Sequence, residues 1–108
     1  MLPLKLDLRP QHLEIVKQIL QKHVPYYAVW AFGSRIKDKA KPYSDLDLAV
    51  ICDQPLPWSV QASLAEDFSE SDLPFRVDVV DWAVASESFR QIIQQAYLVV
   101  LDGQCPKN

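Results

Sequence analysis

The 108-residue chain has little of what several common classes of protein depend on. It contains two cysteines, Cys52 and Cys105, whose separation does not match a metal-ligand motif, so reduced cytosolic thiols are expected. No apolar run approaches the length of a membrane span, and the N-terminus has no signal-peptide pattern. The net charge of −3 argues against a basic nucleic-acid-binding domain. The sequence therefore indicates a cytoplasmic globular domain rather than a secreted, membrane-spanning or nucleic-acid-binding protein.

Glycine is equally scarce, and one of the two glycines begins the most informative stretch of the chain. From Gly33 to Leu48 the sequence reads GSRIKDKAKPYSDLDL. Gly33 follows an apolar run ending at Phe32, so a strand is expected to end at a residue without a Cβ. At such a point, backbone N–H groups and the Ser34 hydroxyl can approach a phosphate group closely.

The loop that follows, residues 33–44, is basic although the chain as a whole is acidic. It contains four basic residues and one acidic residue, which gives a net formal charge of +3; these residues are Arg35, Lys37, Lys39, Lys41 and Asp38. A short positive segment of this kind suits one small polyanion rather than the surface of a nucleic acid. The alternative interpretation is an ordinary solvated lysine-rich loop.

Two aspartates close this stretch, at the start of the expected strand 45–51. Side chains alternate along a strand, so Asp45 and Asp47 share one face and lie roughly 6–7 Å apart. Two such carboxylates repel each other unless a cation lies between them, and Mg²⁺ prefers oxygen ligands of this kind. Alternatively, Asp45 belongs to a turn and Asp47 is an exposed strand residue.

A third acidic candidate lies in the segment 75–82, which is rich in β-branched and aromatic residues and is expected to form a strand. Asp78 lies inside this run between two valines, where an unpaired carboxylate is costly. Asp81 comes three positions later, so it points to the opposite face or lies at the strand end in a turn or capping role. The pattern alone leaves both as candidates.

The combination of Gly33-Ser34, ten intervening residues and then Asp45-x-Asp47 resembles the signature of the DNA polymerase β-type nucleotidyltransferase superfamily. The resemblance is greatest to the minimal nucleotidyltransferases (MNT domains), which are encoded beside a helical HEPN partner. It implies a Mg²⁺-dependent enzyme with ATP as substrate. The implied catalytic and metal-binding residues, for two Mg²⁺ ions, are Asp45, Asp47 and Asp78. The implied nucleotide-binding residues are Gly33, Ser34, Arg35 and Lys37.

The same resemblance implies that AMP is transferred to a protein acceptor, a tyrosine of a paired HEPN toxin, so that the chain acts as an antitoxin. Two alternatives stay open: a non-catalytic antitoxin that neutralises its partner by forming a complex, and a nucleotidyltransferase acting on a small molecule or an RNA end. The small size of the chain leads us to expect that a partner, or a second copy in a homodimer or heterotetramer, completes the site. Related loops often carry a second glycine near Asp38, which this chain lacks.

The scaffold is expected to be one α/β domain of the α+β type, residues 1–108, with a mixed sheet of about four strands and helices packed against it. The order is α-β-β-α-β-α-β. Helices are predicted at 10–22 and 58–70, with a third capped by Ser86, and strands at 26–32, 45–51, 75–82 and 97–101. Trp58 is expected to pack, and the inner face of the third helix is predicted to carry Phe89, Ile92, Ile93 and Ala96.

Overall fold

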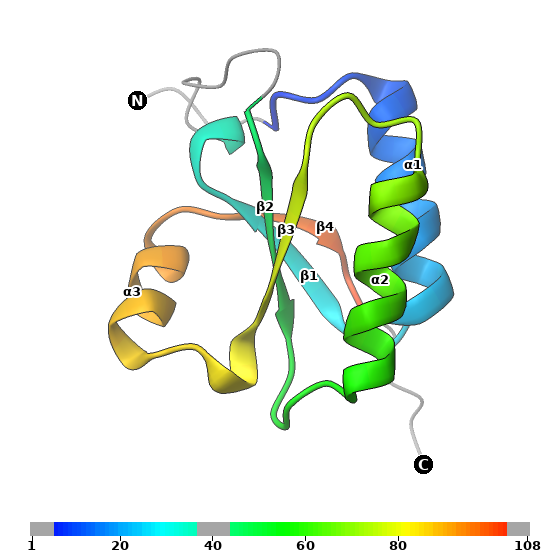
Figure 1. Ribbon diagram of the computed structural model, residues 1–108. Helices are drawn as coiled ribbons and strands as arrows, with labels where there is room; N and C mark the ends of the chain where they lie inside the picture. The colour runs from blue at the N-terminus through cyan, green and yellow to red at the C-terminus, as the bar shows by residue number, and fades with distance from the viewer. Residues whose placement is uncertain (1–5, 37–43, 104–108) are drawn as a thin grey trace.

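Four strands form one mixed sheet in the computed structural model, which describes residues 6–36 and 44–103 (Figure 1). The strand order is β3-β2-β1-β4, with β3 and β4 at the edges. Strand β1 (Ala28–Phe32) is antiparallel to both β2 (Leu46–Ile51) and β4 (Leu98–Leu101), whereas β2 and β3 (Val77–Asp81) run parallel. This confirms the predicted α+β class and the mixed sheet.

The helices cover the two faces of the sheet unequally. Helices α1 (Pro10–His23) and α2 (Trp58–Glu70) lie side by side on one face, and α3 (Glu87–Gln95) lies on the other (Figure 1). None of these helices, within the described part of the chain, is long and apolar enough to cross a membrane. The tightest part of the core joins α1 and α2 to the sheet, and its fully buried members include Val16, Leu20, Leu64, Val29, Leu48 and Val50. The face that carries α3 is covered by this single helix of nine residues (Figure 1).

Local sequence signals set the ends of the helices. Pro10 occupies the first turn of α1, where its missing N–H costs nothing, and α2 begins directly after Pro57. The Ser86 hydroxyl accepts a hydrogen bond from the Phe89 N–H at 3.2 Å, so the predicted cap of α3 is confirmed. The predicted helix 58–70 is confirmed to the residue, and α1 extends one residue beyond its predicted end.

All four strands are shorter than predicted: β2 and β4 each begin one residue later, β3 begins at Val77 rather than at residue 75, and the changes at the start of β1 and the end of β3 have a visible cause. Strand β1 begins at Ala28 rather than at residue 26, because Tyr27 donates its N–H to the Val24 carbonyl in a turn after Pro25. Strand β3 ends at Asp81, because the Asp81 side chain accepts the Ala83 N–H and turns the chain into a 3₁₀ helix, η2 (Trp82–Val84). Both changes arise from local hydrogen bonds that compete with strand pairing.

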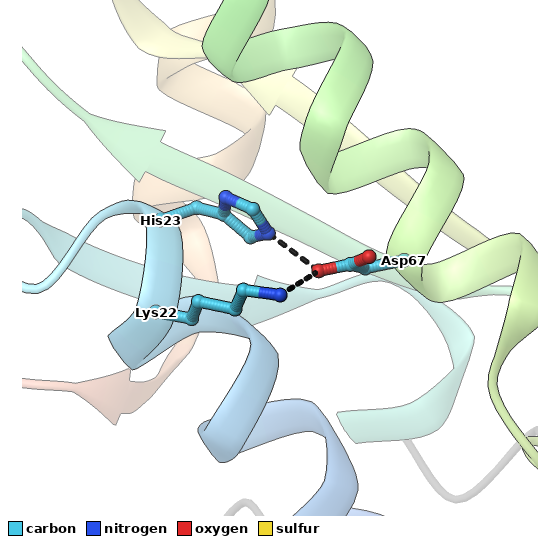
Figure 2. Close-up of polar contacts among 3 residues, drawn as sticks. All are labelled: Lys22, His23 and Asp67. Atoms are coloured by element: carbon cyan, nitrogen blue, oxygen red, sulfur yellow. Dashed lines mark hydrogen bonds and ion pairs between the residues drawn. The ribbon is translucent and has the colours of Figure 1, made fainter.

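A polar contact ties α1 to α2 at the surface (Figure 2). One carboxylate oxygen of Asp67, in α2, accepts hydrogen bonds from His23 Nε2 at 2.5 Å and from Lys22 Nζ at 3.4 Å. The hydrogen bond from His23, followed by the hydrogen bond and positive charge of Lys22, lowers the pKa of the Asp67 carboxyl below its ordinary value of 3.8. The charged form of Asp67 is thus favoured by the folded state.

We expect the contribution of Asp67 to stability to depend on pH. Because its folded-state pKa lies below the unfolded value, the stabilisation is complete above about pH 4 and is lost as pH falls through the folded-state pKa. Urea denaturation from pH 7 to pH 3 should show Asp67→Asn less stable than wild type at neutral pH, with the two converging in acid. The exposed neighbour Glu66 provides the control, Glu66→Gln. A stability difference that does not change with pH would contradict the electrostatic interpretation.

Candidate active site

Two carboxylates lie next to each other where β2 and β3 begin. Asp47 of β2 and Asp78 of β3 are direct partners in the parallel register. Paired residues on adjacent strands project from the same face, and the strands are about 4.8 Å apart. Asp78 is exposed and Asp47 is half-buried. The alternation of β3 therefore directs Asp78, and not Asp81, to the face that carries Asp47.

The third carboxylate belongs to Asp45, which is exposed and lies immediately before β2. Burial is the main cause of a raised pKa at Asp47, and the negative charges of Asp78 and Asp45 raise that pKa further. Both neighbours therefore act electrostatically on Asp47. No three acidic, histidine or cysteine side chains within residues 6–36 and 44–103 are gathered closely enough to form a ready metal-binding group. Asp47 and Asp78 share one face of the sheet, and the charge of Asp45 acts on Asp47 from the residue before β2.

Gly33 lies against the Asp47 carboxylate. It directly follows β1, whose last residue, Phe32, pairs with Asp47. Gly33 has a φ of +84°, a conformation that other residues rarely adopt. A Cβ at this position would also collide with Asp47 Oδ2 and lie 3.3 Å from Asp47 Cγ. The turn formed by Gly33 and Ser34 can therefore lie beside the carboxylates only because residue 33 is glycine.

The basic residues of the same stretch are placed differently. The short 3₁₀ helix η1 (Ser34–Ile36) begins at Ser34, which is half-buried and close to the surface. Arg35 is only 6% exposed, and its guanidinium donates to backbone carbonyls inside the protein. Lys37 and Asp38 lie outside the described residues. The structure thus brings Gly33 to the Asp47 carboxylate and gives Arg35 partners that the sequence did not reveal.

Asp81 faces the opposite side of the sheet, as its spacing from Asp78 predicted. It is 8% exposed and accepts hydrogen bonds from the N–H groups of Leu56 at 2.9 Å and Ala83 at 3.0 Å. The Cys52 thiol lies 3.0 Å from the same carboxyl, and burial together with this hydrogen bond raises the pKa of Cys52 to about 11. Asp81 therefore joins the segments after β2 and β3 and caps η2.

Aromatic side chains line the face of the sheet that carries the carboxylates. Phe89 of α3 contacts Phe32 edge-to-face, with ring centroids 5.8 Å apart. Trp30 stacks on Tyr97 at 3.9 Å and meets the edge of Trp82 at 5.5 Å. These contacts pack α3 and β4 against this face of the sheet and line it with aromatic rings.

Comparisons with known proteins give a consistent result. A sequence model of the family described as "Polymerase beta, Nucleotidyltransferase" matches residues 14–103. Over 100 residues the chain is 58% identical to "Probable protein adenylyltransferase MntA" of Haemophilus influenzae, a match that covers 93% of this chain and 88% of that protein.

Solved structures are similar in fold. A crystal structure of a toxin-antitoxin with AMP-PNP matches with a TM-score of 0.71 and 25% identity, over 85% of this chain and 74% of that chain. A tri-AMPylated HEPN toxin of Shewanella oneidensis in complex with MNT antitoxin matches with a TM-score of 0.64 and 26% identity, over 85% of this chain and 71% of that chain.

Proposed function

Because the chain belongs to the polymerase β nucleotidyltransferase family, we propose that it transfers AMP from ATP to a protein acceptor. The observation that carries this proposal is the contact between the Gly33 turn and the Asp47 carboxylate, with Asp78 beside it on the next strand. It puts backbone donors suited to phosphate next to carboxylates suited to a divalent cation. This arrangement supports a nucleotidyl-transfer site that combines a phosphate-binding turn with carboxylate ligands for a cation.

The donor set of the site fits Mg²⁺. Burial, followed by the negative charges of Asp78 and Asp45, disfavours the ionised form of Asp47, and a bound cation favours that form by its opposite charge. We assign Asp45 and Asp47 as ligands of two Mg²⁺ ions, with Asp78 completing the site of one of them. Bound Mg²⁺ supplies a lowered pKa for the attacking hydroxyl and neutralises charge on the departing pyrophosphate.

The remaining groups hold the nucleotide. The backbone N–H groups at Gly33 and Ser34 and the Ser34 hydroxyl bind the β- and γ-phosphates, with Lys37 as an auxiliary contact. A hydroxyl of the acceptor attacks the α-phosphate in line, forming a new P–O bond to AMP as the bond to pyrophosphate breaks. The acceptor's proton is released to solvent. No serine, cysteine or histidine nucleophile is required.

The relatives support a proposal for the nature of the acceptor. One is named a probable protein adenylyltransferase, and another structure holds a tri-AMPylated HEPN toxin with an MNT antitoxin. We therefore infer that the acceptor is a tyrosine of a paired HEPN toxin and that the chain is an antitoxin acting in the cytoplasm. We also infer that residues 1–108 act as one domain, and that the HEPN partner or a second copy completes the site.

The test is a transfer assay with ATP labelled at the α-phosphate, Mg²⁺ and the HEPN protein encoded nearby. We expect label on the partner and a mass increase of one or more AMP units on tyrosine. The Asp45→Asn/Asp47→Asn double variant should transfer no AMP and fail to neutralise the partner. Full neutralisation by this double variant, with no change in the partner's mass, would favour neutralisation by complex formation. Label on a small molecule or RNA end, and none on protein, would favour the third function.

Gly33→Ala should lower transfer at least tenfold, because a Cβ here strains the positive φ and displaces the Asp47 carboxylate. Gly103→Ala is a matched control, since Gly103 has a φ of +73° and its Cβ would collide with the backbone of residues 27 and 28, not with a carboxylate. Both variants should unfold at lower temperature than wild type, but only Gly33→Ala should lose kcat when assayed fully folded. Equal kcat values would show that the glycine matters for folding alone.

A further inference from the structure

Three separate segments of the chain meet at the side chain of Arg35. Its Nε donates to the Ser44 carbonyl at 3.0 Å, and its Nη1 donates to the Asp7 carbonyl at 2.9 Å. Its guanidinium carbon lies 4.2 Å from the centroid of the Phe75 ring. The backbone carbonyl of Arg35 also accepts the Asp7 N–H at 2.7 Å. The side chain is therefore both buried and bonded on several sides.

Two of these segments, together with the Arg35 segment itself, hold the parts of the proposed site. Arg35 itself follows Gly33 and Ser34, the Ser44 carbonyl lies directly before Asp45, and Phe75 lies three residues before Asp78. A further hydrogen bond, from the Leu46 N–H to the Arg76 carbonyl at 2.8 Å, joins the starts of β2 and β3. One side chain thus connects the phosphate-binding turn to the beginnings of both carboxylate strands.

The chemistry of the contact requires arginine. A planar guanidinium donates in fixed, divergent directions and stacks its face on a ring, whereas a lysine ammonium is a compact point charge with no flat face. Both carbonyl bonds and the stack on Phe75 engage Arg35 within the protein, at 6% exposure. We propose that Arg35 is a positioning residue that fixes the Gly33–Ser34 turn relative to Asp45, Asp47 and Asp78, and that it does not bind phosphate. This inference rests on the proposed function.

The test compares Arg35→Lys with wild type in the complex with the HEPN partner. We expect kcat to fall by about 10–100-fold, the range seen when groups that orient metal ligands are changed, with KM for ATP changed less than about threefold. In the free chain, Mn²⁺ affinity measured by calorimetry without nucleotide should also fall several-fold, because the carboxylates lose their alignment. A tenfold rise in KM with kcat unchanged, or a loss of nucleotide affinity that grows from AMP to ATP, would show direct phosphate binding and overturn the proposal.

Arg90 provides a matched control. Its Nε and Nη2 donate to the carbonyls of Trp82 at 2.9 Å and Ala83 at 3.1 Å, and its guanidinium lies 5.3 Å from the Trp82 ring centroid. It therefore makes the same kinds of contact as Arg35, but between α3 and η2. Arg90→Lys should lower the unfolding temperature and leave kcat and Mn²⁺ affinity unchanged. If Arg35→Lys behaves in the same way, its role is merely structural and the proposal fails.

A second variant covers the case in which Arg35→Lys does not fold. Phe75→Leu leaves the donors of both carbonyl hydrogen bonds of Arg35 in place and removes the aromatic face beside the guanidinium, along with the edge contact between Phe75 and His12, so we expect smaller losses of kcat and Mn²⁺ affinity in the same direction. Normal values in folded Phe75→Leu would count against the proposal. The Mn²⁺ measurement does not require AMP transfer, so it tests the positioning role of Arg35 even if the wild-type protein transfers no AMP. Absence of AMP transfer by wild type would overturn only the proposed function.

Discussion

Replacing Asp47 with asparagine is expected to abolish AMP transfer and, at neutral pH, to stabilise the free chain. The loss of transfer should be at least about 100-fold, because even groups that only orient metal ligands cost 10–100-fold when they are changed. The gain in stability follows from the electrostatics of the free site. Asp47 is half-buried beside the charges of Asp78 and Asp45, so its ionised form is disfavoured in the folded state.

The pH dependence of this stability difference has a definite sign. Burial, Asp78 and Asp45 raise the folded-state pKa of Asp47 above its ordinary value of 3.8, so wild type loses stability as pH rises through that folded-state pKa. Asp47→Asn cannot ionise at this position and avoids that loss. Without Mg²⁺, the variant should therefore have a higher unfolding temperature than wild type at pH 7, and this difference should disappear below about pH 4.

Magnesium should reverse the order of stability. A cation that binds the folded state raises its stability in proportion to the logarithm of its concentration over Kd, so Mg²⁺ should stabilise wild type and leave Asp47→Asn nearly unchanged. Asp53→Asn removes an exposed aspartate that lies beyond the end of β2, and it should alter neither transfer nor the response to Mg²⁺. If Asp47→Asn transfers AMP, or is the less stable protein at pH 7 without Mg²⁺, the assigned role of Asp47 is wrong.

The faces of the acidic side chains were predictable because they depend on local alternation alone. Asp45 and Asp47 are two residues apart and Asp78 and Asp81 are three apart, so parity assigns each one to a face. The register that sets Asp78 opposite Asp47 is a long-range pairing, which no local pattern contains. Only the family resemblance selected Asp78, and the parallel pairing of β2 and β3 supplies the physical reason.

The role of Arg35 could not be predicted from the sequence. The family resemblance groups it with Lys37 as a nucleotide contact, whereas the contacts that the structure describes for it include the main-chain carbonyls of Asp7 and Ser44, which have no sequence signature. Contacts of this kind depend on where the tertiary fold places the backbone. The burial of Arg35 likewise depends on Phe75, which is 40 positions away along the chain.

The burial of two apolar residues on helices was also not predictable from the local sequence. The prediction that Trp58 packs is wrong, since it is 82% exposed at the first position of α2, beyond the core face of that helix. The prediction that Ile92 lies on the inner face of α3 is also wrong, since it is 54% exposed while its neighbour Ile93 is fully buried. A short helix on one side of a sheet buries only a narrow stripe of its side chains. The width of that stripe depends on the sheet beneath the helix.

Asparagine substitutions at Asp78 and Asp81 are expected to have opposite effects on activity and stability. Asp78 is exposed beside Asp47, so Asp78→Asn should lower transfer by about 100-fold or more and leave the free energy of unfolding unchanged or slightly raised. Asp81 is buried and uses both carboxyl oxygens as acceptors, one for the Leu56 N–H and the other for the Ala83 N–H. Its contribution is therefore to folding.

An asparagine at position 81 cannot accept both N–H groups, because one carboxyl oxygen is replaced by an NH₂ donor. At least one backbone N–H loses its acceptor, which costs about 1–3 kcal/mol and lowers the unfolding temperature by about 4–8 °C per kcal/mol in a domain of this size. Assays of the folded fraction should nevertheless show near-normal kcat for Asp81→Asn, because its carboxyl faces away from Asp47. Chemical denaturation and single-turnover AMP transfer, measured on both variants, provide the comparison. Two results would mean that the two aspartates have been assigned to the wrong faces of the sheet. One is a loss of kcat in Asp81→Asn with unchanged stability, and the other is a loss of stability in Asp78→Asn with unchanged kcat.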